Sequence, residues 1–231
     1  MPSFRRYTLA PLIVSGIILS FAAPAKGALV ITPEQRNHVS LNGHLDYLED
    51  PGSQIKLRDI HALSDSFQRL ENKTPNFKFT SSAYWFRFSL TNQTNDGTLV
   101  LEIGYPLLDD VQFFQKTNGE DYQKYQSGDS FPFSNRAHPH RTINFQVNLE
   151  PNSTETFNLR AKTAGPFKLP LNVHTEEHFF ETAITENTAL GLFYGVLLIM
   201  ILLNGLLFFH LREASYGYFV AFLMLFFSFQ F

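Results

Sequence analysis

The aspartates of this sequence are the first residues to consider for catalysis. Asp109, Asp110 and Asp129 have the residue type of a glycosidase pair, in which one carboxylic acid protonates the leaving group and a second carboxylate attacks or activates water. Asp is also common in turns that flank strands. The sequence has no nucleophile-elbow, zinc-protease, P-loop, dinucleotide-binding or EF-hand motif, and it has no cysteine. We therefore interpret the aspartates as turn residues and predict a protein that is not an enzyme.

The densest polar group is His138-Pro139-His140-Arg141. Two histidines at positions i and i+2 of an extended segment point the same way, so they could share a metal ion with Asp129 or Asp109. They could also be loop residues that hydrogen-bond to neighbouring turns, and the sequence favours this interpretation. Calcium binding by Glu102, Asp109, Asp110 and Asp129 needs a convergence of oxygen ligands that a sequence does not display. We predict neither a metal site nor a cofactor.

Trp85 is the only tryptophan, and it alternates with a run of apolar residues. It therefore lies on the strand face opposite the core, together with Arg87. An aromatic plane beside a cation on an open sheet suits stacking on a sugar ring or pairing with an acidic ligand; burial in the core of a sandwich is the alternative. The predicted ligand-binding residues are Trp85, Arg87, Tyr105, Asp109, Arg136, His140 and Arg141.

The elements that position these residues are mostly strands. Residues 84–91 alternate, with Tyr84, Phe86, Phe88 and Leu90 toward the core, and turn residues at 92–97 lead to a second alternating run at 99–103, which predicts a hairpin. Further strands are predicted at 111–115, 143–149, 156–162 and 167–174, a short helix at 57–70, and a helical or irregular connector at 176–187. This pattern predicts a mainly β fold, an antiparallel jelly-roll β-sandwich followed by transmembrane α-helices.

Two apolar segments follow the strands. Residues 189–209 contain no Asp, Glu, Lys, Arg or Pro, and an α-helix of about 20 such residues crosses the hydrocarbon core of a bilayer. After a polar break, residues 216–231 are apolar again. At the other end, a basic and then apolar stretch ends in Ala23-Pro24-Ala25, which is typical of a cleaved signal peptide. The predicted domains are a signal peptide at 1–25, a periplasmic sandwich at 26–187, transmembrane helices at 188–209 and 216–231, and a cytoplasmic turn at 210–215.

Composition limits the environment and the partners. A formal net charge of −3 gives no reason to expect nucleic-acid binding. Without cysteine the exported domain has no disulfides, so its own core must hold it together, and about 160 residues are enough for one such domain. The leader, the spans and Arg212 in the inner turn predict a protein of the bacterial inner membrane with residues 26–187 in the periplasm.

Several short stretches occur in a specific order: His44–Pro51, Tyr84–Phe88 with Asn92, Leu101–Asp109, Gly128–Asp129, Pro132–Arg136, His140–Arg141, Leu169–Leu171 and Gly191–Tyr218. Taken together, they resemble the type-2 extracellular domain and the start of the membrane region of the bacterial seven-transmembrane receptors with diverse intracellular signalling modules. The likeness covers about residue 38 to the end of the sequence. The resemblance implies a periplasmic jelly-roll sensor similar to carbohydrate-binding modules, joined to a seven-helix membrane unit and a cytoplasmic histidine kinase or diguanylate cyclase.

These observations predict the ligand-sensing and membrane-entry portion of a signal-transduction receptor that does no chemistry itself. Because the sequence ends in its second apolar segment, we expect a fragment that lacks the remaining helices and the output module. The expected partners are a small-molecule ligand such as a carbohydrate, the lipid bilayer, and a membrane or periplasmic protein. The alternatives are an exported, membrane-tethered glycoside hydrolase and a protein-binding assembly subunit.

Overall fold

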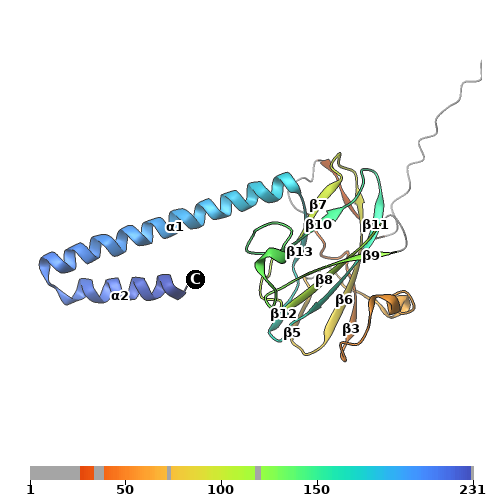
Figure 1. The fold of residues 1–231 in the computed structure, drawn as a ribbon, viewed down its shortest axis with the longest axis horizontal. Coiled ribbons are helices and arrows are strands. Elements are labelled where there is room, and N and C mark those ends of the chain that lie inside the picture. The colour runs from red at the N-terminus through yellow and green to blue at the C-terminus, as the bar shows by residue number, and fades with distance from the viewer. Residues whose placement is uncertain (1–26, 34–38, 72–73, 118–120, 230–231) are drawn as a thin grey trace, which may run out of the picture.

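The computed structural model describes residues 27–33, 39–71, 74–117 and 121–229, so the predicted signal peptide lies outside the described residues. A β-rich domain comes first, and a pair of helices projects from it (Figure 1). The strands are β1 (Leu29–Ile31), β2 (Val39–Ser40), β3 (Asp46–Asp50), β4 (Gln68–Arg69), β5 (Asn76–Phe79), β6 (Ala83–Asn92), β7 (Thr98–Ile103), β8 (Asp110–Lys116), β9 (Tyr122–Ser127), β10 (Ile143–Asn148), β11 (Thr154–Lys162), β12 (Pro166–Lys168) and β13 (Leu171–Thr175). The helices are α1 (Glu176–Leu211) and α2 (Ala214–Phe229), with short 3₁₀ turns η2 (Leu57–Asp59), η3 (Ser64–Ser66) and η4 (Phe133–Asn135).

Two sheets make the sandwich. The larger has the order β4-β3-β6-β11-β8-β9, with β1 added to β6, and the smaller has the order β10-β7-β13-β2. Apart from the parallel β1–β6 pair, the strand pairs of both sheets are antiparallel. A third, two-stranded ribbon joins β5 and β12. The predicted fold, a mainly antiparallel β-sandwich followed by an apolar helix that could cross a membrane, is confirmed.

The core between the sheets follows from the period of two along each strand. On β6 the residues Tyr84, Phe86, Phe88 and Leu90 are buried, as their alternation predicted. They meet inward residues of β11 and β8 in the same sheet and of β7, β10 and β13 in the other. Aromatic rings connect the layers, since Phe113 of β8 lies 5.5 Å from Phe145 of β10 between ring centroids.

The opposite face of β6 is covered rather than open. Trp85 is only 1% exposed, because the segment that contains η2 and η3 folds over it and forms a second, smaller apolar cluster. The Trp85 ring stacks on Phe114, with 5.5 Å between centroids. The prediction that Trp85 stands on an open sheet face is therefore wrong. The short helix predicted at 57–70 is also wrong, because this stretch forms η2, η3 and the strand β4.

The connection from β6 to β7 also differs from the prediction. The predicted hairpin does not form, because β6 belongs to the large sheet and β7 to the small one. Asn92 stabilises the corner between them. Its Nδ2 donates to the carbonyl oxygens of Asp96 at 2.6 Å and Leu149 at 2.8 Å. The chain therefore crosses between the two layers here instead of turning back within one.

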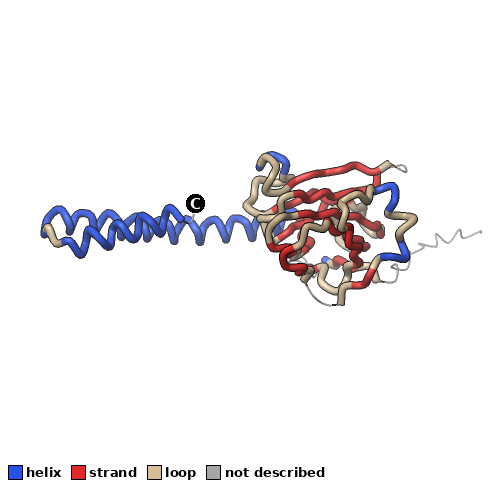
Figure 2. The backbone as a smooth tube through the Cα atoms, turned by 90° about the horizontal axis from the view of Figure 1, so that it is seen from below, coloured by secondary structure: helices blue, strands red, loops and turns tan. Residues whose placement is uncertain are grey.

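Helix α1 leaves the sandwich directly from its last strand. Thr175, the final residue of β13, caps the helix by accepting a hydrogen bond from the backbone N–H of His178 at 3.4 Å. The helix then runs 36 residues without interruption, roughly 54 Å. Residues 176–187, predicted as a helical or irregular connector, are part of this one helix. The helix α2 folds back alongside α1, so the two project together from the sandwich (Figure 2).

Within the described residues, α1 is the one helix that is long and apolar enough to cross a membrane, and α2 is a shorter apolar helix. Most large apolar side chains of α1 beyond Ala189 are exposed in the structure. An apolar exterior of this kind requires lipid or other apolar helices around it.

We expect Gly128→Ala to destabilise the sandwich. Gly128 has a φ of +151°, and a Cβ added there would lie 2.3 Å from the carbonyl oxygen of Asp109. This backbone contact cannot relax by moving a side chain, so the free energy of unfolding should fall by about 2 kcal/mol or more. Chemical unfolding followed by Trp85 fluorescence measures the change. Gly97→Ala is the matched control, because its nearest atom would be Pro151 Cδ at 4.0 Å; equal effects of the two substitutions would contradict the close approach at Gly128.

Candidate ligand-binding face and helix junction

The outer face of the large sheet carries a row of polar side chains that the alternation of β8 and β11 places there. Asp110 and Gln112 of β8 lie directly opposite Lys162 and Arg160 of β11. On the next strand, Gln126 of β9 lies opposite Gln112. Because β11 and β8 send their other residues into the core, these five side chains share one face.

Asp110 is the centre of this polar row. Its Oδ2 accepts a hydrogen bond from Gln112 Nε2 at 2.9 Å, and its Oδ1 accepts one from Gln126 Nε2 at 2.7 Å. Arg160 forms an ion pair with Asp110, with 3.5 Å between NH1 and Oδ2. These contacts fix the orientation of the carboxylate, so the face offers hydrogen-bonding groups in set positions.

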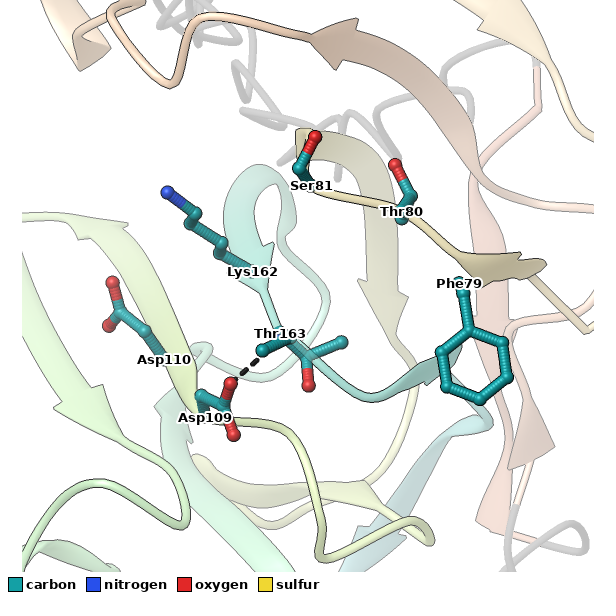
Figure 3. Close-up of a pocket in the computed structure, with 8 residues that line it drawn as sticks. Phe79, Thr80, Ser81, Asp109, Asp110, Lys162 and Thr163 are labelled. Carbon is teal, nitrogen blue, oxygen red and sulfur yellow. Dashed lines mark hydrogen bonds between the residues drawn. The ribbon is translucent and has the colours of Figure 1, made fainter.

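At one end of the row is a cavity of about 650 Å³. Figure 3 shows Asp110 and Lys162 pointing the same way, with Phe79 on the other side of Thr163. Asp109 Oδ2 accepts a hydrogen bond from the backbone N–H of Ala164 at 2.7 Å. The Phe79 side chain is 77% exposed, unusual for an aromatic ring in a domain with a large core. The cavity is lined by Phe79, Thr80, Ser81, Asp109, Asp110, Lys162, Thr163 and Ala164.

A second cavity, of about 450 Å³, lies along the same sheet face. Its floor is made by side chains of β6, β8 and β11, and its wall by the loop before η2 and by β9. Arg160 links it to Asp110 and therefore to the first cavity. The second cavity is lined by residues 53–57, Trp85, Gln112, Phe114, Lys124 and Arg160.

The predicted site residues do not form one site. Asp109 lines the first cavity and Trp85 lines the second. Arg87 instead holds the covering segment: its guanidinium lies 4.4 Å from the Phe67 ring centroid, and its NH2 donates to the carbonyl oxygen of Ser64 at 3.4 Å. Tyr105 is partly buried and packs against the main core.

The other three predicted residues, Arg136, His140 and Arg141, gather where α1 meets the small sheet. Arg136 NH1 donates to the carbonyl oxygens of His140 and Arg141, at 2.5 Å and 2.8 Å, which closes the loop before β10. Arg141 NH2 donates to Glu186 Oε2 of α1 at 2.7 Å. Arg141 and His140 therefore contact α1 while Arg136 holds their loop, and none of the three lines either cavity.

Phe179 of α1 is the centre of this junction. It is 3% exposed, and its ring centroid lies 5.6 Å from that of His138, 5.2 Å from His140 and 5.9 Å from His174. His174 Nε2 pairs with Glu102 Oε2 at 2.7 Å, and Thr142 Oγ1 donates to Glu102 Oε1 at 2.9 Å. The junction is thus a ring of histidines around one phenylalanine, with a mostly buried glutamate behind it.

Two protein-family models match the chain, one over the sandwich and one over the helices. The family model described as 7TMR-DISM extracellular 2 matches residues 42–175, more than half of the chain. A second model, 7TM diverse intracellular signalling, matches residues 186–231. This chain belongs to the 7TMR-DISM family.

The resemblance stated from the sequence is therefore confirmed. The 7TMR-DISM match makes the chain a sensing and signalling portion of a membrane receptor, located in the inner membrane with a periplasmic segment. The first family model ends at residue 175, immediately before α1 begins, and the second begins at residue 186, ten residues into the helix. Comparison with curated proteins gives no match to this chain.

Metal binding at this 7TMR-DISM junction was one interpretation of the histidines. Over the described part of the chain, no three His, Asp or Glu side chains are grouped so that they could hold a metal ion. His138 and His140 both face α1, where their Nε2 atoms lie 3.9 Å from Glu176 Oε1 and 3.8 Å from Glu186 Oε2. Their arrangement suits helix docking.

Burial and neighbouring groups shift the pKa values of two residues at the junction, His140 and Glu102. The pKa of His140 is below its ordinary value of 6.5, mainly because burial disfavours the charged ring; Arg141 and Arg136 act in the same direction, and Glu102 and Glu186 oppose it. For Glu102, burial alone would raise the pKa, but hydrogen bonds from His174 and Thr142 and the nearby histidines outweigh it, and the pKa falls below 4.5.

Sequence reasoning missed Phe79, Asp110, Arg160 and Lys162 as members of the ligand face. For Arg160 and Lys162 a signal existed, because Phe157, Leu159 and Ala161 are inward and their neighbours must face outward. Asp110 was considered as a glycosidase carboxylate and as a calcium ligand, and was interpreted as a turn residue. Nothing in the sequence marked Phe79, whose exposure depends on the β5–β12 ribbon.

We expect acidification to destabilise the junction through His140. Because its pKa is lower in the folded protein, the unfolded chain binds the proton more readily, and stability falls as the pH drops below about 6.5. The contribution of Glu102 is retained until below about pH 4.5. His140→Gln should therefore lose less stability than the wild type between about pH 7 and about pH 5.

Thermal unfolding of the full chain in detergent at these two pH values measures the difference. His61→Gln is the control, because His61 is exposed and lies on the segment over Trp85, away from α1. An unchanged pH dependence in His140→Gln would show that His140 does not titrate with folding.

Proposed function

We propose that the periplasmic sandwich binds a small polar ligand of the carbohydrate class in the cavity of Phe79, Asp109, Asp110 and Lys162. The observation that carries the proposal is an exposed aromatic ring at the edge of a cavity that also holds fixed hydrogen-bonding groups. Sugar rings present an apolar face that stacks on aromatic rings and a rim of hydroxyls that need donors and acceptors. Lys162 supplies a donor, and the carboxylates of Asp109 and Asp110 supply acceptors.

The carboxylates are placed for binding rather than for turnover. Asp110 already accepts hydrogen bonds from two glutamine amides, and Asp109 accepts one from the backbone of Ala164. Such contacts hold a carboxylate as an acceptor and fix its direction. The domain then acts as a non-catalytic sensor, and its output is a change in the helix that leaves it.

The ligand acts on the membrane region through α1. Because α1 begins at the end of β13 and continues into the apolar segment, a shift of the sandwich moves the membrane helix with it. Binding changes the balance between two placements of the sandwich over the helices. It does so only by as much as the ligand's affinities for the two placements differ.

Phe79→Ala should weaken sugar binding about tenfold, since loss of a stacked ring costs roughly 1–1.5 kcal/mol. Calorimetric titration of the full chain in nanodiscs with a panel of neutral and acidic oligosaccharides measures the affinity. Phe133→Ala is the matched control, because Phe133 is 53% exposed but lies beside Arg136, outside both cavities. Unchanged affinity in Phe79→Ala would remove the cavity from the proposal.

The same titration separates the rival functions. Hydrolysis of a bound oligosaccharide that Asp109→Asn or Asp110→Asn abolishes would favour the glycoside hydrolase. Absence of binding by every sugar, together with specific capture of a periplasmic protein that Phe79→Ala prevents, would favour the protein-binding subunit.

A further inference from the structure

Arg160 is a partly buried cation with one relatively long ion pair among the described residues. Its side chain is 11% exposed, and among the described residues its ion pair is with Asp110, with 3.5 Å between NH1 and Oδ2. Asp110 is at the same time the acceptor for Gln112 and Gln126. A charge removed from water is costly unless it is well paired and hydrogen-bonded, so this guanidinium still favours a further anionic partner.

The cavity beside Arg160 has the charge to supply that partner. Lys56 and Lys124 also line it, and none of its lining residues is acidic. Even with Asp110 counted against Arg160, the two lysines leave an excess of positive charge. A cavity of about 450 Å³ has room for part of a small ligand.

One neutral group of this cavity is a hydrogen-bond donor without an acceptor among the described residues. The Nε1–H of Trp85 is buried and has no hydrogen-bond partner among the described residues. Tryptophan Nε1 can only donate, so a partner must bring an oxygen or another acceptor. Arg160, Lys56, Lys124 and Trp85 therefore all offer donors.

From this arrangement we propose that the cavity of Arg160, Lys56 and Lys124 binds the anionic group of an acidic sugar, above all the carboxylate of a uronic acid. A guanidinium matches the two oxygens of a carboxylate, and the lysines add charge at the rim. The inference rests on the proposed function, because Asp110 joins this cavity to the Phe79 cavity. A ligand that stacks on Phe79 with one sugar unit can place an acidic neighbour over Arg160.

The test uses trigalacturonate and its fully methyl-esterified form, which keeps the sugar rings and removes the charges. Both are titrated into the full chain in nanodiscs, with Trp85 as the reporter, since this single tryptophan lines the cavity. We expect the acid to bind at least tenfold more tightly than the ester. We also expect Arg160→Gln to reduce the affinity for the acid by ten- to hundredfold and to reduce the affinity for the ester much less, since for the ester only the support that Arg160 gives to Asp110 is lost.

Lys124→Gln is the second variant, because Lys124 is an exposed residue of the same cavity and its replacement is less disturbing to folding than that of Arg160. Lys124→Gln should weaken binding of the acid. It should also make that binding less dependent on salt concentration. Lys168→Gln, on the exposed face of β12 and outside both cavities, is the matched control and should change neither.

Two results separate this inference from the proposed function, and a third refutes the inference. Equal affinity for acid and ester, unaffected by Arg160→Gln and Lys124→Gln but lowered by Phe79→Ala, would overturn the anionic cavity and leave the sugar site. Preference for the acid that is lost in Arg160→Gln but unaffected by Phe79→Ala would support the anionic cavity and refute the Phe79 site. If neither sugar nor sulfate alone changes Trp85 emission or produces heat, the anionic cavity is refuted.

Discussion

The burial of Phe179 between the small sheet and the first turns of α1 is the contact on which the rest of the receptor portion depends. One buried ring joins the helix to three histidines from the loop before β10 and from β13. Because Thr175 both ends β13 and caps α1, no flexible linker separates the strand from the helix. The direction of a helix of roughly 54 Å is therefore fixed at its root.

The contacts that hold the start of α1 are largely polar, which lowers their net contribution to stability. Glu102 and His174 are mostly removed from water, and the desolvation of such groups offsets much of what their pairing contributes. An entirely apolar contact around Phe179 would hold the helix more firmly and would be insensitive to protonation. The histidines around Phe179 therefore attach α1 less firmly than an apolar contact would.

The core faces of the strands could be predicted from the sequence, because local periodicity determines them. Contacts between segments that are distant in the sequence could not. The alternation of Tyr84, Phe86 and Phe88 identified the core face of β6, because a strand exposes its two faces in turn. The same alternation cannot show which sheet the next strand joins, and the crossing at Asn92 depends on the carbonyl oxygen of Leu149, 57 positions away. The covering of Trp85 likewise depends on how residues 55–67 fold back over the sheet.

The candidate site shows the same limit. Polar density around residues 136–141 was interpreted as a ligand surface, but the partner of Arg141 is Glu186, on a helix 45 positions later. Asp109, one of the predicted ligand-binding residues, lines a cavity because it ends a loop at the start of a strand, where the chain is free to present side chains. Phe79 was missed because an exposed aromatic ring looks, in sequence, like one more core residue.

The ligand face and the helix root are on different sheets, and the core between them is the physical route that joins them. Strand β8 carries Asp110 and Gln112 on its outer face and Phe113 on its inner face, so one strand touches both the cavities and the core. Phe113 packs on Phe145 of β10, and the loop that precedes β10 brings His140 to Phe179. Close-packed interiors have few voids in which a displacement could be lost. Phe113, Phe145 and the loop before β10 therefore form a continuous packed path from β8 to Phe179, and the polar contacts around Phe179 are the least apolar part of that path.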